Sequence, residues 1–198
     1  MKFYPENEIV PEKRQSEAFL IRPLQVSDVE LDFQAVISSR EKLLKRTAGR
    51  WPKPGFTIKE NLADLEYHEQ QHKKRIEFTF TIMNVMETEC LGCIYIHPLV
   101  KVLKSSISEN DITSLDISDY EAWITFWVTP IAAEQQLDKK VIEELQNWFS
   151  KEWAFSKVTL SFGPRPSTHE LELVEKAGLK ERYSFQTDEG SLIAWELH

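Results

Sequence analysis

The stretch Tyr120–Trp148, YEAWITFWVTPIAAEQQLDKKVIEELQNW, decides the fold of this chain because it joins a strand directly to a helix. Its first residues are β-branched and aromatic, which predicts a strand that ends at Thr129-Pro130. Apolar residues then recur at helical spacing, at Leu137, Val141, Leu145, Trp148 and Phe149. The free N–H groups at the start of such a helix are typical anion ligands, but a turn that wraps phosphate normally contains glycine. This turn has none, so it keeps the layout of a phosphate site without its usual residues.

Composition excludes several classes of protein. The 198 residues carry a net charge of -8, which disfavours a nucleic-acid partner because phosphate backbones attract a basic surface. The beginning of the chain lacks the apolar core of a signal peptide, and no run approaches the roughly 20 apolar residues of a membrane span. Two cysteines are too few for a disulfide framework. We therefore expect a cytoplasmic protein, a monomer or homodimer, with no membrane partner.

The pattern of elements predicts an N-terminal arm over residues 1–17 and a single domain over residues 18–198. Capping boxes at Ser27–Glu30, Thr57–Glu60 and Ser167–Glu170 mark three helix starts, and residues 101–119 are expected to form a polar surface excursion. The expected strands are 18–24, 78–85, 91–100, 123–128, 158–162, 180–187 and 192–197. The resulting order, β-α-α-β-β-β-α-β-α-β-β, is that of an α+β domain.

Four motifs in this order resemble the GNAT acyltransferase superfamily, in particular its ribosomal-protein acetyltransferase-like branch. They are FLIRPLQVSD (19–28), CLGCIYIHPL (90–99), FWVTP (126–130) and LELVEKAGL (171–179). The resemblance implies a mixed sheet that splays between its fourth and fifth strands. It also implies acetyl-CoA as cofactor, with the pantetheine arm along the fourth strand beside Trp127, Val128 and Thr129. A primary amine of a small molecule or peptide would then attack the thioester directly in a ternary complex.

The cofactor turn departs from the family pattern, which runs V-x-P-x-x-R-G-x-G-x-G. Laid on Val128 and Pro130, the basic position falls on Ala133, and the three glycine positions fall on Glu134, Gln136 and Asp138. Like charges about 4 Å apart repel by roughly 4 kcal/mol at an effective dielectric near 20, so these carboxylates oppose a pyrophosphate. Lys139 partly offsets them. A second interpretation is that Thr129-Pro130 simply starts the helix early.

The catalytic and acceptor positions are also altered. The family often has a tyrosine as general acid where this chain has Val174, which has no proton to donate. Glu121, at the entrance of the fourth strand, is the remaining candidate base, although a strand end is also where a solvated carboxylate is common. For the amine acceptor the resemblance implies Arg50, Trp51, Phe56 and Tyr95; a hydrophobic clasp over the sheet is the other interpretation of these aromatics.

Two short motifs with histidine and cysteine offer a rival interpretation as a metal site. His68-Glu-Gln-Gln-His72 matches the H-E-x-x-H zinc motif on a predicted helix, and Cys90-Leu-Gly-Cys93 follows it. The helix is polar throughout, and two cysteines three residues apart on a strand point to opposite faces unless a bulge or turn brings them together. We therefore predict no metal, and a zinc-dependent hydrolase is the remote alternative.

Two functions remain open from the residues alone. One is an acyl-CoA-dependent N-acyltransferase, diverged at its cofactor turn. The other is a binding or regulatory protein that keeps the fold without CoA, since function depends on the site rather than the fold.

Overall fold

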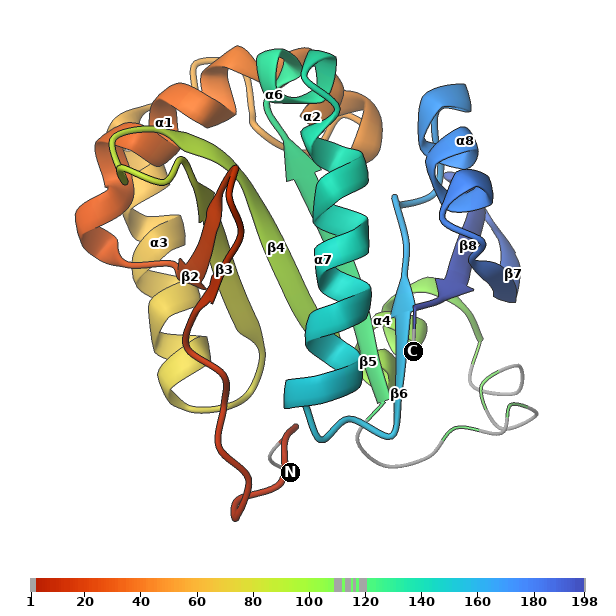
Figure 1. Cartoon of the computed structure of the whole chain (residues 1–198). Helices are drawn as coiled ribbons and strands as arrows, with labels where there is room; N and C mark the ends of the chain where they lie inside the picture. The colour runs from red at the N-terminus through yellow and green to blue at the C-terminus, as the bar shows by residue number, and fades with distance from the viewer. Residues whose placement is uncertain (1–2, 109–111, 113–114, 116, 118–120, 198) are drawn as a thin grey trace.

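The computed structural model describes residues 3–108, 112, 115, 117 and 121–197. These residues form one sheet with helices on both faces (Figure 1). The strands are β1 (Arg14–Gln15), β2 (Leu20–Pro23), β3 (Phe78–Met83), β4 (Cys90–Pro98), β5 (Glu121–Val128), β6 (Lys157–Leu160), β7 (Lys180–Thr187) and β8 (Gly190–Glu196). After the short 3-10 helix η1 (Val26–Asp28), the helices are α1 (Val29–Ser38), α2 (Arg40–Arg46), α3 (Ile58–Lys73), α4 (Leu99–Ser106), α6 (Pro130–Glu134), α7 (Leu137–Glu152) and α8 (Thr168–Lys176).

The eight strands lie in the order β1-β2-β3-β4-β5-β6-β8-β7, and β5 and β6 form the parallel pair in an otherwise antiparallel sheet. This mixed α+β architecture confirms the predicted fold class. The β5–β6 pairing runs from Glu121 with Lys157 to Ile124 with Leu160, whereas β5 itself continues to Val128. The two strands therefore separate over the second half of β5, where the family resemblance implies a splay.

Three local predictions were wrong. The first capping box belongs to Gln25 and Asp28, which start η1 two residues earlier than predicted. A single helix was expected from Val29 to Leu44. The helix is instead interrupted at Ser39, so that α1 and α2 are separate elements. The strand predicted to reach residue 100 ends at Pro98, which cannot donate to the ladder, and α4 begins there. Part of the predicted excursion 101–119 is thus helical, and most of its second half lies outside the described residues.

The N-terminal segment packs onto the domain. Phe3 and Tyr4 are buried, and the Tyr4 hydroxyl accepts a hydrogen bond from the backbone N–H of Ala154 at 2.8 Å. Arg14–Gln15 adds a short edge strand to β2. The predicted arm is therefore tied down at both of its ends by contacts with the sheet and with the end of α7.

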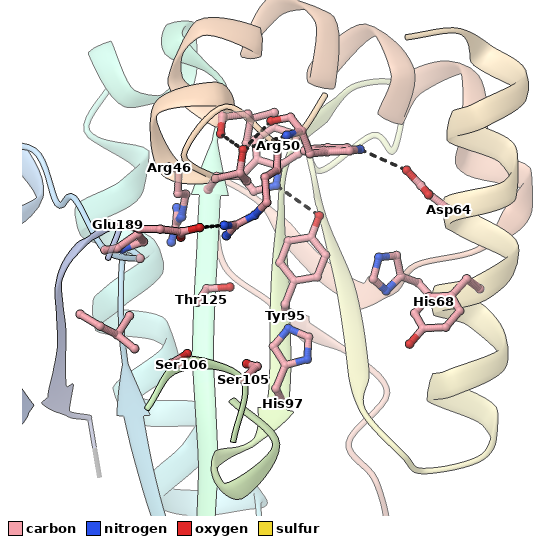
Figure 2. Close-up of a pocket in the computed structure, with 18 of the residues that line it drawn as sticks. Arg46, Arg50, Asp64, His68, Tyr95, His97, Ser105, Ser106, Thr125 and Glu189 are labelled. Carbon is pink, nitrogen blue, oxygen red and sulfur yellow. Dashed lines mark hydrogen bonds and ion pairs between the residues drawn. The ribbon is translucent and has the colours of Figure 1, made fainter. Parts of the chain in front are cut away.

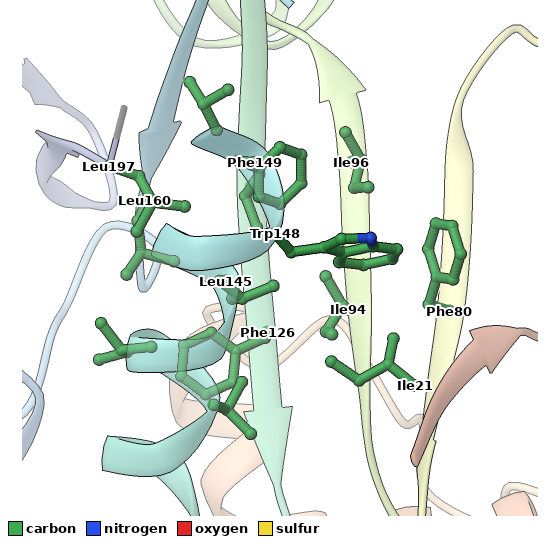
Figure 3. Close-up of a cluster of buried hydrophobic side chains, with 14 of the residues drawn as sticks. Ile21, Phe80, Ile94, Ile96, Phe126, Leu145, Trp148, Phe149, Leu160 and Leu197 are labelled. Atoms are coloured by element: carbon green, nitrogen blue, oxygen red, sulfur yellow. The ribbon is translucent and has the colours of Figure 1, made fainter. Parts of the chain in front are cut away.

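The alternation of side chains along β5 divides the molecule into two layers. Trp123, Thr125 and Trp127 face the side of α1 to α4, where a large cavity opens (Figure 2). Ile124 and Phe126 face the other side, where α7 lies across the sheet and its apolar stripe forms the main core (Figure 3). Functional chemistry is therefore expected on the cavity side, and stability on the α7 side.

Candidate functional site

A cavity of about 900 Å³ lies on the α1–α4 side of the sheet. Side chains of β4 and β5 form its floor, and α3, the segment after α2, and the turn between β7 and β8 form its walls (Figure 2). Its size falls within the range of small-molecule sites, which are concave and mostly apolar with a few polar groups. The charged and aromatic side chains that line it include Arg46, Arg50, Trp51, Asp64, His68, Tyr95, His97, Trp127 and Glu189.

An aromatic wall with a carboxylate beside it forms one part of the cavity. The Trp51 indole N–H donates to Asp64 at 3.2 Å, and the Trp127 indole N–H donates to the Tyr95 hydroxyl at 3.4 Å. Phe56 packs edge-on against Trp51 with 5.7 Å between ring centroids, behind the wall. Burial raises the pKa of the Asp64 carboxyl and raises that of the Tyr95 hydroxyl. The wall thus combines apolar surface with one desolvated acidic group.

Titratable groups on the cavity floor hold fixed charge states. The Nδ1 atom of His68 lies 3.1 Å from the Thr79 hydroxyl, and burial lowers the pKa of His68 to about 4, so its ring is neutral at pH 7. The Oε2 atom of Glu77 lies 3.1 Å from Nδ1 of His97 and 2.5 Å from Nζ of Lys101. Burial opposes ionisation of Glu77, but these two hydrogen bonds outweigh it and lower its pKa to about 2.

An ion pair spans the mouth of the cavity. Arg50, just after α2, pairs with Glu189 in the turn between β7 and β8 (Figure 2). Both side chains are partly exposed, so the pair is worth little stability and is easily exchanged for contacts with a ligand. The pair therefore defines an entrance that a charged ligand can open.

Arg46, at the end of α2, inserts between the separating strands. Its guanidinium donates to the backbone carbonyl of Phe126 on β5 and, at 3.2 Å, to that of Ser161 just after β6. It also lies over the Phe162 ring, 5.3 Å from the centroid. These carbonyls lie where β5 and β6 separate, so the chain's own side chain occupies the inner end of the splay.

The turn after β5 keeps a strained backbone at one position. Thr129 caps the five-residue helix α6, accepting from the Ala132 N–H at 3.4 Å, so a helix does start early as the second interpretation holds. That helix ends at Glu134, and Gln136 then adopts a left-handed conformation with φ 58° before α7 begins. A left-handed non-glycine residue is unfavourable, and Gln136 stands at a glycine position of the family turn. The bend thus persists although its glycine is gone.

Asp138 occupies the anion position at the start of α7. Its carboxylate is buried, accepts from the Lys139 backbone N–H at 2.9 Å, and lies 2.6 Å from the Nε2 atom of His169. Because His169 is in the first turn of α8, the pair connects the N-terminal ends of α7 and α8. Negative charge is favoured at a helix N-terminus, and here an internal carboxylate supplies it.

The other residues predicted for the cofactor turn do not line the cavity. Glu134 is exposed at the end of α6, so only one of the two predicted carboxylates stands at the start of α7. Lys139 is exposed and pairs with Glu143 at 3.8 Å, and Ala133 is partly buried against the core. Val128 and Thr129 are buried in the strand end. Lys139 therefore forms its ion pair with Glu143 rather than with Asp138.

Glu121 lies apart from the cavity. It is buried at the start of β5, where it accepts from the Tyr183 hydroxyl at 3.3 Å and lies 3.7 Å from the Arg182 guanidinium. Trp123, two residues along the same strand face, separates it from Thr125 on the cavity floor. The interpretation of Glu121 as a solvated residue is wrong, because it is 4 % exposed. Its partners make it part of a structural network beside β7.

The two histidines of the H-E-x-x-H motif contact the same strand residue. His68 and His72 both lie near Thr79, the first at its hydroxyl and the second at its carbonyl, 3.1 Å away in each case. Cys90 and Cys93 converge, because the structure has the bulge that the sequence left open. A bulge opposite Ile82 and Met83 adds a residue to β4, so both cysteines pack in the same cluster under α1.

Sequence reasoning missed three groups of this region. Arg46 was visible only as a basic residue near the cavity, and no local pattern marks a side chain that will enter a splay between strands. His169 looked like an ordinary first-turn residue of α8, and Asp64 like a polar position of a surface helix. Each gains its role from a partner distant in sequence, such as Asp138 for His169.

No family model matches the chain, and no curated protein matches it. Solved structures do. The ribosomal-protein-S5-alanine acetyltransferase of Vibrio fischeri matches with a TM-score of 0.68 and 11% identity over 94% of this chain and 96% of that one. RimL, a ribosomal L7/L12 alpha-N-protein acetyltransferase in complex with coenzyme A, gives 0.68 and 12% over 96% and 97%. MccE, a microcin C7 self-immunity acetyltransferase in complex with acetyl-CoA and AMP, gives 0.70 and 9% over 91% and 92%.

The fold is therefore that of the GNAT acetyltransferases, as the four sequence motifs predicted. At these low identities the similarity establishes the architecture alone. Among the described residues, no helix is long and apolar enough to cross a membrane.

Proposed function

We propose that this protein binds a small amine-bearing ligand in the cavity over β4 and β5 and does not use acyl-CoA. The observation that carries the proposal is the Asp138–His169 pair, which places a buried carboxylate where the family turn would receive pyrophosphate. A phosphate about 4 Å from this carboxylate would be repelled by roughly 4 kcal/mol at an effective dielectric near 20, about a thousandfold in affinity.

Arg46 supports the same conclusion independently. Its guanidinium bridges the carbonyls of Phe126 and Ser161, so a pantetheine arm entering the splay would have to displace it. Burial lowers the pKa of Arg46, yet the group stays charged at pH 7 because an arginine pKa is far above neutrality. The chain's residues therefore do not fit CoA at either end of its expected path, and no catalytic step is derived through it.

The chemistry of the cavity favours a ligand with an amino group. Asp64 provides a carboxylate at the indole N–H edge of Trp51, and Tyr95 lines the same cavity; aromatic faces attract cations as well as apolar groups. Glu189 provides a second carboxylate at the mouth. An ammonium group that approached Asp64 would also relieve the cost of burying that carboxylate alone.

Calorimetric titration with acetyl-CoA and with desulfo-CoA tests the cofactor part. We expect no heat and no thermal shift for the wild type, and measurable binding when Asp138→Gly is combined with Arg46→Ala. Glu134→Gly is the matched control, because it removes an exposed carboxylate of the same turn and leaves Asp138 in place. Micromolar binding of acetyl-CoA to the wild type would contradict the proposal.

A thermal-shift comparison of tyramine with N-acetyltyramine tests the ligand part. We expect stabilisation by the free amine only, and loss of that stabilisation in Asp64→Asn. Glu60→Gln, which changes an exposed carboxylate on the same helix, is expected to respond like the wild type. Equal responses of the two compounds would remove the amine from the proposal.

The second candidate is amine acetylation by acyl-CoA. The left-handed Gln136 favours it, because the turn keeps the bend of a cofactor loop. Acetylation of tyramine by the wild type, with acetyl-CoA consumed in equal amount, would establish this activity in place of binding alone.

A further inference from the structure

Three metal-ligand side chains converge in the layer between α1 and the sheet. The carboxylate of Asp32 and the thiols of Cys90 and Cys93 offer atoms that all lie within 4.8 Å of one another. All three residues are buried, and the Cys93 thiol donates to Asp32 at 3.4 Å. Their surroundings are apolar, formed by Leu24, Ala35, Val36, Leu43, Leu65, Met83 and Trp127.

The bulge in β4 creates this cluster. Cys93 pairs with Thr81 and Cys90 pairs with Met83, while Gly92 pairs with the intervening Ile82, so Leu91 is the inserted residue. Thr81 and Met83 are two residues apart and share a sheet face, which brings the two cysteines onto that face as well. A regular strand would have separated them.

We propose that Asp32, Cys90 and Cys93 bind a thiophilic divalent cation, with zinc as the metal that suits this donor set. Two thiolates and one carboxylate are ligands that zinc accepts, and three protein ligands leave a fourth position open. The side-chain oxygen of Asn61, 1 % exposed, has no hydrogen-bond partner among the described residues, and its amide nitrogen donates to Asp32 at 3.0 Å. Asn61 is thus positioned beside the cluster with an unused oxygen.

The surroundings meet two further requirements of a metal site. Outer hydrogen bonds orient the ligands: Asn61 holds the Asp32 carboxylate, and the Thr81 hydroxyl lies 3.5 Å from the Cys90 sulfur. Asp32 and Asn61 also line the large cavity, which gives an ion a path from solvent to the cluster. The site is separate from the amine-binding proposal and does not depend on it.

Metal binding here would be coupled to proton release. Cysteine ligates zinc as the thiolate and aspartate as the carboxylate, so every proton that these three side chains carry must leave when the ion binds. The cation would displace those protons to solvent and form two metal–sulfur bonds and one metal–oxygen bond. Affinity would therefore rise with pH.

Metal analysis of untagged, reduced protein tests the proposal, followed by Co²⁺ titration of protein stripped with a chelator. We expect about one zinc per chain and a thiolate-to-cobalt charge-transfer band. The isosteric variants Cys90→Ser and Cys93→Ser are expected to lose the band, and Asp32→Asn to weaken Zn²⁺ binding by at least about tenfold. Circular dichroism of each variant without metal shows whether it is folded.

The control removes the competing sequence motif. A His68→Gln/His72→Gln double variant lacks both histidines of H-E-x-x-H and is expected to bind cobalt with the wild-type spectrum. Loss of the band in that variant would transfer the site to the histidines. Absence of zinc from the wild type, together with no charge-transfer band at saturating Co²⁺ when both thiols titrate as free, would overturn the proposal without recourse to any variant.

Discussion

His68 makes the stability of this protein depend on pH in a window that can be calculated. Its pKa is about 4 in the folded chain, against an ordinary value of 6.5, because burial disfavours the charged ring. The unfolded chain therefore binds more protons than the folded chain between these two values. For a histidine whose folded pKa is lowered, stability is fully present above pH 6.5 and falls as the pH drops toward 4.

The size of the effect follows from the same two values. The difference of 2.5 pH units, at about 1.36 kcal/mol each, gives a total loss of about 3.4 kcal/mol of unfolding free energy as the pH falls from well above 6.5 to well below 4. The pKa of His72 is also lowered by burial and adds a loss of the same sign. Glu77, with a pKa of about 2 against 4.5, loses its contribution only at lower pH.

Urea unfolding at pH 7.5, 6, 5 and 4.5 measures this dependence, followed by tryptophan fluorescence. We expect His68→Gln to have a flatter pH profile than the wild type, and His72→Gln to remove only its own smaller share. A wild type that is equally stable at pH 7.5 and 4.5, or a His68→Gln profile parallel to the wild type, would refute the burial of a neutral ring.

Two further predictions concern the sheet and its core. Gly92→Ala is expected to destabilise by more than about 3 kcal/mol, because the new Cβ would lie 2.0 Å from the Trp127 carbonyl oxygen; Gly178→Ala, with open space around it, is expected to lose about 1 kcal/mol in the same urea assay. Trp148→Ala is expected to lower the unfolding free energy by about 3–5 kcal/mol, because its fully buried ring packs against Phe80 with 5.1 Å between ring centroids (Figure 3). The control Ile131→Ala, at an exposed position, is expected to change it by no more than about 0.5 kcal/mol.

The sequence predicted the fold well where one local pattern and its burial agree. The apolar stripe from Leu137 to Phe149 is helical at every position and faces the sheet, because the same spacing serves both the helix and the core. The boxes at Thr57 and Ser167 cap the helices they announced, since a cap is settled by residues three apart. Local chemistry was sufficient for these elements.

The candidate site was harder because its contacts are made between distant segments. The bulge that aligns Cys90 with Cys93 follows from pairing with β3, which no local period reveals. Glu121 was assigned by its place at a strand end, but its neighbours on β7 decide its surroundings. Trp51 and Tyr95, which the resemblance implies for the acceptor site, both line the cavity.

Arg46 and Asp138, the two departures from a cofactor site, have the same physical reason. A splay between strands leaves carbonyls without ladder partners, and a helix N-terminus leaves N–H groups without acceptors, so both must be satisfied when the fold stands alone. Arg46 supplies donors to the first, at Phe126 and Ser161, and Asp138 supplies an acceptor to the second at Lys139. Each side chain has the charge that complements the backbone groups it meets. A chain that had lost only its glycines would keep both sets of groups open for a ligand. This chain meets both needs with its own residues, and its cavity opens on the face of β5 that carries Trp127.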